Sequence, residues 1–189
     1  KVDTIPDLTA RAERFVIDND RMLYAPFFVR AEEFCVENSV LIGGRVGLDM
    51  LMNKPIGKDS FVWDLYTDNT FNTATQLAIT LSTTVSPHVP PKTVALQTNI
   101  EYREFSISIY ARLVFRIYAM DKYRDIKLID LMGPATRPGY FSPIELKCIS
   151  EEMQLIDIYR TLYTPAKLHL WRSDYVAEAV LYGLIKDEI

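Results

Sequence analysis

The fold is decided by the stretch Val40-Leu41-Ile42-Gly43-Gly44-Arg45-Val46-Gly47-Leu48-Asp49-Met50-Leu51, which is followed by Phe61-Val62-Trp63-Asp64-Leu65-Tyr66. A short apolar run leads into a pair of glycines, an amphipathic segment follows, and a second apolar run carries the acidic residue Asp64. Backbone amides at a glycine turn that opens a helix attract phosphate. A carboxylate on the next strand can hold Mg2+ against that phosphate. The order therefore predicts a strand, turn, helix and strand that place a phosphate site beside a metal-binding carboxylate.

The composition is that of an ordinary globular protein. Hydrophobic residues make up 49% and charged residues 24% of the 189 positions, which suits one domain with a helical appendage. No apolar run approaches the roughly 20 residues that span a bilayer, so we expect no membrane contact. The first twenty residues are too polar for a signal peptide. The chain lacks an initial methionine and ends abruptly, so we interpret it as a piece of a longer polypeptide.

The two cysteines, Cys35 and Cys148, form neither a disulfide framework nor a metal-ligand pattern. We interpret them as small buried side chains in a reducing compartment, which favours a cytoplasmic protein.

The hydrophobic periodicity predicts a mixed α/β or α+β architecture with flanking helices. We expect residues 1–38 to form a helical segment, with Pro26 opening its second helix, and residues 39–189 to form the main domain. The sheet should have about five strands, at 40–42, 61–67, 93–98, 104–109 and 113–119. Further helices are predicted at 45–52, 70–84, 151 onward and 176–184, and a loop at 133–139.

The glycine turn is Ile42-Gly43-Gly44-Arg45-Val46-Gly47-Leu48-Asp49-Met50-Leu51, and the strand after it is Phe61-Val62-Trp63-Asp64-Leu65-Tyr66-Thr67-Asp68-Asn69. Much later in the chain comes the run Lys147-Cys148-Ile149-Ser150-Glu151-Glu152-Met153-Gln154-Leu155-Ile156-Asp157-Ile158-Tyr159-Arg160-Thr161-Leu162-Tyr163-Thr164-Pro165-Ala166-Lys167-Leu168. In order and spacing, these stretches resemble the poly(A) polymerase catalytic subunits of large nucleocytoplasmic DNA viruses. The resemblance implies a nucleotidyltransferase-like domain that adds adenylates to RNA 3′ ends, using ATP with Mg2+ or Mn2+. It also implies a cytoplasmic viral factory or a virion as the location.

The resemblance assigns roles to individual residues. It implies that Gly43 and Gly44 approach the triphosphate and that Arg45 or Lys167 pairs with phosphate. It also implies that Asp64 or Asp59 is the catalytic acid that binds metal, with Glu104 as the candidate for a further metal-binding acid.

One feature departs from the family pattern, which has Asp-x-Asp on the strand after the glycines and a third acid on a later strand. Here Asp59-Ser60-Phe61 has an acid only at its first place, and Val62-Trp63-Asp64 only at its last. An odd spacing would point Asp59 and Asp64 to opposite faces of one regular strand. The alternative function is therefore a catalytically degenerate nucleotidyltransferase-fold module for RNA binding or subunit contact.

The charge distribution leaves RNA binding open. The net charge of −4 argues against a dominant nucleic-acid surface, yet residues 101–147 hold eight Lys and Arg against six Asp and Glu, or 8 − 6 = +2. Arg112 and Arg116 in this segment are candidate RNA contacts; a solvated sheet face would explain them equally well. Besides RNA and ATP, the expected partners are the remainder of the polypeptide and a second copy in a homo-oligomer.

Overall fold

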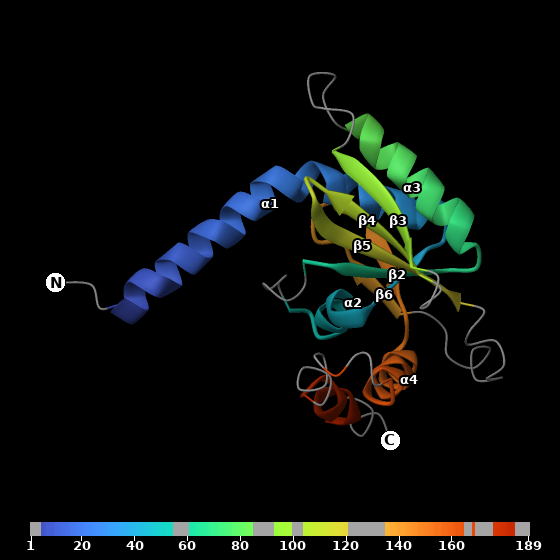
Figure 1. Ribbon diagram of the computed structural model, residues 1–189. Coiled ribbons are helices and arrows are strands. Elements are labelled where there is room, and N and C mark those ends of the chain that lie inside the picture. The colour runs from blue at the N-terminus through green and yellow to red at the C-terminus, as the bar shows by residue number, and fades with distance from the viewer. Residues whose placement is uncertain are drawn as a thin grey trace.

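The computed structural model describes residues 5–54, 61–84, 93–99, 104–120, 135–164, 168 and 176–183. It contains one mixed sheet of seven strands with helices against it (Figure 1). The helices are α1 (Ile5–Glu37), α2 (Gly44–Leu51), α3 (Thr70–Thr84) and α4 (Glu151–Leu162), with a further helix at 176–183. The strands are β1 (Leu41–Gly43), β2 (Trp63–Thr67), β3 (Val94–Asn99), β4 (Glu104–Ile109), β5 (Arg112–Ala119), β6 (Ala135–Pro138) and β7 (Glu145–Cys148).

The order of strands across the sheet is β3-β4-β5-β2-β1-β7-β6. β2 is antiparallel to β1 and parallel to β5, so the glycine turn after β1 lies next to Asp64 on β2. The mixed sheet and flanking helices confirm the predicted class, but the count of about five strands was wrong. The two missed strands, β6 and β7, are four residues each and pair with one another at the far edge, where Pro138 is tolerated. The predicted loop at 133–139 is thus partly strand.

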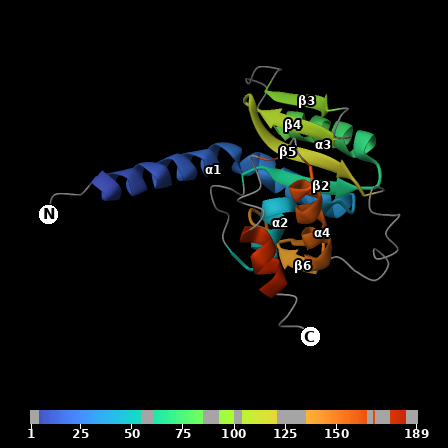
Figure 2. The ribbon, with the colours of Figure 1, turned by 60° about the horizontal axis from the view of Figure 1, so that its bottom comes forward.

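α1 is one continuous helix, whereas the sequence predicted a second helix starting at Pro26. Pro26 lies inside it and is exposed. The residues that follow, Phe27, Phe28 and Phe34, are buried against the sheet, and this packing offsets the backbone hydrogen bond that proline removes. The N-terminal half of α1 extends away from the rest of the molecule (Figures 1 and 2).

Two groups of helices cover the sheet. The C-terminal half of α1 and α3 pack on one face, where Leu65, Phe115 and Ile117 meet the aromatic residues of α1 and Leu77 of α3. α4 packs on the other face against Tyr66 and Tyr118. α2 lies between the sheet and α4. No described helix combines the length and the apolarity that a bilayer span requires.

A buried carboxylate fastens α1 to the loop between β6 and β7. Glu32 is fully buried and accepts hydrogen bonds from the backbone amides of Tyr140, Phe141 and Ser142 at 2.6–3.2 Å, and from the Ser142 hydroxyl at 2.5 Å. A side chain at Gly139 would collide with the same carboxylate, since its Cβ would lie 2.9 Å from Glu32 Oε2. One acidic residue thus fixes the position of the whole loop.

The turn between β4 and β5 has two residues in the left-handed region, Tyr110 at φ 51° and Ala111 at φ 61°. A two-residue hairpin of this kind usually contains Asn and Gly, and this turn has neither. Edge-to-face contacts of Tyr110 with Tyr24 and Phe27 of α1 hold the turn against the core. Tertiary packing therefore compensates for local strain.

Replacing Glu32 with Ala should lower the free energy of unfolding by about 3–5 kcal/mol, because several buried amides lose their acceptor. Urea unfolding measures this effect. Glu33→Ala is the matched control: Glu33 is half-exposed and pairs with Arg30 on the surface, so its loss should change stability by about 0.5 kcal/mol or less. Equal effects of the two variants would contradict the anchoring role of Glu32.

Ala111→Gly should raise the free energy of unfolding by about 0.5–1 kcal/mol, because glycine adopts a positive φ without steric cost. Ala95→Gly, within β3, should lower it by about the same amount. The measurement is urea unfolding of both variants beside the parent chain. Destabilisation by Ala111→Gly would mean that the turn is not left-handed in solution.

Candidate functional site

The candidate site is a row of side chains that crosses the sheet and ends at the glycine turn. The strand registers pair Gln97 with Ser106, Ser106 with Arg116, Arg116 with Asp64, and Asp64 with Gly43. Paired residues in neighbouring strands point to the same face of a sheet. Asp64 therefore stands next to the N-terminal end of α2, which is where the sequence placed it.

The space beside each glycine is already filled by a side chain from β2. A Cβ on Gly44 would lie 2.1 Å from Asp64 Oδ2, and a Cβ on Gly43 would lie 2.5 Å from Cε2 of the Tyr66 ring. Gly44 also has φ +59°, a conformation that favours glycine. Internal packing of Asp64 and Tyr66 thus accounts for both glycines.

Asp64 is held by an arginine. Arg116 donates from Nε to Asp64 Oδ1 at 2.6 Å and from Nη2 to Asp64 Oδ2 at 3.0 Å, a two-pronged geometry that matches a guanidinium to a carboxylate. Burial by itself would lower the pKa of Arg116, but the charge of Asp64 and its hydrogen bonds outweigh burial and raise the pKa. The carboxylate also sits at the positive end of α2, where an anion is stabilised.

A second row lies beside the first and contains two stacked tyrosines. The registers pair Glu104 with Tyr118, Tyr118 with Tyr66, and Tyr66 with Leu41. The rings of Tyr66 and Tyr118 are stacked, with their centroids 5.3 Å apart. The Tyr66 hydroxyl donates a hydrogen bond to Asp157 Oδ2 of α4 at 2.7 Å. Burial raises the pKa of Tyr118, so its phenol stays neutral. In the sequence, Asp64 matches the last place of an Asp-x-Asp; in a register that began at Asp64, Tyr66 would take the second acidic place.

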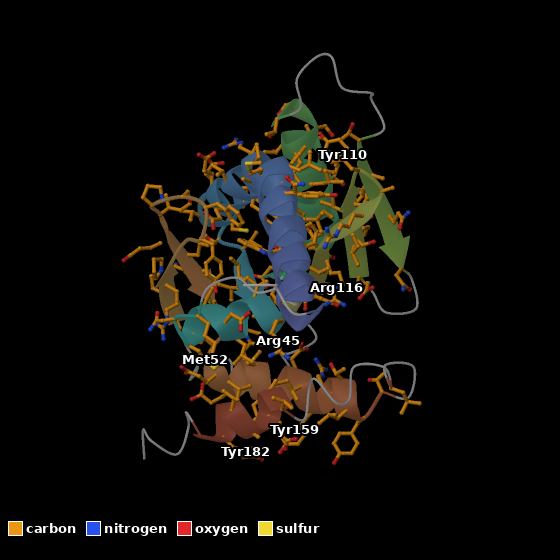
Figure 3. All side chains as sticks on the ribbon, turned by 90° about the vertical axis from the view of Figure 1, so that its left-hand side faces the viewer. Arg45, Met52, Tyr110, Arg116, Tyr159 and Tyr182 are labelled. Carbon is orange, nitrogen blue, oxygen red and sulfur yellow. The ribbon has the colours of Figure 1, made fainter. Side chains whose placement is uncertain are left out.

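The other predicted site residues are spread over the molecule. Figure 3 shows Arg45 at the boundary between α2 and α4, with Arg116 above it on the side of the sheet. The guanidinium of Arg112 lies over the Phe61 ring, 3.5 Å from its centroid, at the opposite end of β5 from Tyr118. Glu104 begins β4, one strand beyond Arg116. Asp59 and Lys167 lie outside the described residues.

The described residues do not fit a two-metal site. Two metal ions need several carboxylates with free oxygens directed at one point. Both oxygens of Asp64 are engaged by Arg116, and a tyrosine takes the place two residues on. Among the described residues, no three His, Cys, Asp or Glu side chains gather closely enough to hold a metal ion.

The position of Tyr66 on the same face of the sheet as Asp64 can be predicted from the sequence. Asp64 and Tyr66 are two apart on a strand, so period-two alternation already places them on one face. Their pairing with Arg116 and Tyr118 cannot be predicted in this way, because it depends on β5 lying parallel to β2. Arg116 is 52 residues from Asp64 in the sequence.

Gly44→Ala should lower the free energy of unfolding by about 2–4 kcal/mol, from the positive φ and from the collision with the Asp64 carboxylate. In an Asp64→Ala background the collision is gone, so the same change should cost only about 1–2 kcal/mol. Urea unfolding of the four chains gives both values. Gly183→Ala is the control and should not destabilise, because no atom lies within 4 Å of its Cβ. An equal cost of Gly44→Ala in both backgrounds would contradict the contact with Asp64.

Comparison with known proteins supports the fold. No family model matches the chain. It is 25% identical over 170 residues to the uncharacterised protein K421R of African swine fever virus, in isolates from Malawi and South Africa. That match covers 90% of this chain, and the chain spans 39% of the length of these relatives.

Among solved structures, the chain matches the Megavirus polyadenylate synthase with a TM-score of 0.61 and 14% identity, over 96% of this chain and 37% of that protein. A nucleotidyltransferase-like protein from Paracoccidioides brasiliensis matches with a TM-score of 0.49 and 12% identity, over 84% and 76% of the two chains. The fold of this chain is nucleotidyltransferase-like, and its curated relatives are viral.

Proposed function

We propose that this chain is a nucleotidyltransferase-fold domain without adenylate-transfer chemistry of its own, and that it makes contacts to other subunits or domains of a viral RNA-processing protein. The observation that carries this proposal is the ion pair of Asp64 with Arg116 against Gly44. An active site of this family needs open space for phosphate beside the glycine, but here Asp64 occupies the space beside Gly44. It also needs two carboxylates for metal, but Asp64 is paired with Arg116, and the residue two positions later is Tyr66. Similarity of fold does not carry activity with it.

The ion pair would have to break before Asp64 could bind a metal. A partly buried arginine left without its partner is costly, because its charge is then poorly solvated. Asp64 and Arg116 also complete a continuous link from β5 through β2 to α2. In this proposal, their role is structural.

RNA binding receives less support than subunit contact. The two arginines that were candidate RNA contacts have partners within the chain, Arg116 with Asp64 and Arg112 over Phe61. A phosphate-binding surface needs cations directed at solvent, and the basic excess of residues 101–147 is only +2.

The second candidate is an active polynucleotide adenylyltransferase that uses ATP with Mg2+ or Mn2+. Its support is the match to the Megavirus polyadenylate synthase and the position of the Asp64 side chain, which lies on β2 beside the first residue of α2. In this case Asp59 or another acid would have to complete the metal site.

Variants at the ion pair separate the two candidates. In the non-catalytic proposal, Asp64→Asn and Arg116→Met should each lower the free energy of unfolding by about 2–4 kcal/mol, because each leaves a buried group without its partner. The double change Asp64→Leu with Arg116→Met should be less destabilising than the sum of the single changes. Any adenylate addition by the full-length protein should be unchanged wherever the variant is folded.

The assays are primer extension with ATP and Mg2+, and thermal unfolding of the same samples. Glu145→Gln serves as the control, because Glu145 is exposed on β7 and lies outside the ion pair. Loss of adenylate addition in an Asp64→Asn protein that is still folded at the assay temperature would overturn the proposal and favour the enzyme.

A further inference from the structure

The edge of the sheet at β3 is poorly covered. Among the described strands, β3 is terminal in the sheet and pairs with β4 alone. Four consecutive residues, Ala95 to Thr98, are exposed, although successive side chains of a strand point to opposite faces. Side chains on both faces of β3 are therefore exposed, and β3 lies at the rim of the sheet in Figures 1 and 2.

β3 and the helix beside it contain no charged residue. The 15 residues of α3 and the six residues of β3 include no Asp, Glu, Lys or Arg. With 24% charged residues in the chain, 0.24 × 21 gives an expectation of five. Native proteins protect exposed edges with charges, prolines or bulges, and β3 has no charge and no proline. Depletion of charge is instead typical of the centre of a protein interface.

The same surface exposes large apolar side chains. Phe71 and Ile79 of α3 are 68% and 53% exposed, and Leu96 of β3 is 38% exposed. The Phe71 ring contacts Phe105 at the start of β4, which places it on the side of α3 that faces this edge. Val94, Leu96 and Thr98 pair with Ile109, Ile107 and Phe105, so they share the α3 side of the sheet. We call the exposed residues of α3 and β3 together the α3–β3 surface.

We propose that the α3–β3 surface binds a second copy of this chain, with β3 pairing antiparallel to β3 of the other copy across a two-fold axis. The surface offers no cation for a nucleic-acid backbone and no charge for a charged peptide. An uncharged strand is complementary to itself, because antiparallel pairing about a two-fold axis brings each residue near its own counterpart. Two chains of net charge −4 meet with least repulsion where neither carries charge.

Pairing of this kind would supply partners to the outer amides and carbonyls of β3 and would cover Leu96 and Phe71. It joins the two sheets into one continuous sheet. The inference does not depend on the function proposed above, because neither Asp64 nor Arg116 belongs to this surface.

The experiment is sedimentation equilibrium of the chain over a concentration series up to about 100 µM. The parent chain should be a dimer in reversible equilibrium with monomer. Leu96→Lys and Leu96→Glu should each raise the dimer dissociation constant at least about tenfold, since each places two like charges close to the axis. An equimolar mixture of the two variants should regain the parent affinity, as opposite charges then meet.

Tyr163→Lys is the matched control, because Tyr163 is exposed on a different part of the molecule and its change should leave the dimer intact. Thermal unfolding checks that every variant is folded. A second measurement uses Ala95, Leu96, Gln97 and Thr98, each replaced in turn by Cys and oxidised in air. Disulfide-linked dimers should form only at the positions nearest the axis; Cys35 and Cys148 are buried and should not react.

A parent chain that stays monomeric throughout the series would overturn the proposal. So would a dimer that the two Leu96 variants leave unchanged, or one that Tyr163→Lys weakens equally. If a charged variant fails to fold, the cysteine series decides, and equal cross-linking at all four positions or at none would contradict the strand pairing.

Discussion

The contact of Asp64 with Arg116 and Gly44 joins β5, β2 and α2, and the rest of the fold is built around these three elements. Through it, β5 is tied to β2 and β2 to the first turn of α2. The carboxylate is acceptable in a nearly buried place because it has an arginine on one side and the positive end of a helix on the other. Without those two partners, an acid at position 64 would favour exposure and the strand could not remain central in the sheet.

The same contact gives the glycine pair a role in internal packing. A glycine turn before a helix is the common mark of a phosphate site, because the missing side chains let phosphate approach the backbone. Here the missing side chains admit Tyr66 and Asp64 instead. The backbone of the turn is suited to bind an anion, and the carboxylate of Asp64 occupies that place. Activity thus depends on what fills the turn, and the nucleotidyltransferase-like fold is compatible with both outcomes.

Polar anchoring recurs in the fold wherever segments distant in sequence must be held in place. Glu32 of α1 holds the loop between β6 and β7 through backbone amides, and Asp157 of α4 accepts the hydroxyl of Tyr66. Each acid serves a specific set of donors, so each fixes one arrangement where apolar packing would allow several. At the opposite edge of the sheet, the residues of α3 and β3 themselves include no charged side chain, which suits them to contact with another uncharged surface.

The sequence by itself determined the local elements. Alternation predicts β4 at residues 104–109, and the helical period predicts α3 at residues 70–84. The helix predicted from residue 151 onward is α4, and the Ser150 side chain caps it by accepting from the Met153 amide. Only the tertiary structure decided the rest. β6 and β7 are too short to show a period, α1 continues through Pro26 because its aromatic residues are buried, and the Asp64–Arg116 pair forms because β5 lies parallel to β2. Local patterns report which face of a segment is apolar, whereas the partner of a buried charge depends on strand order, which no local pattern encodes.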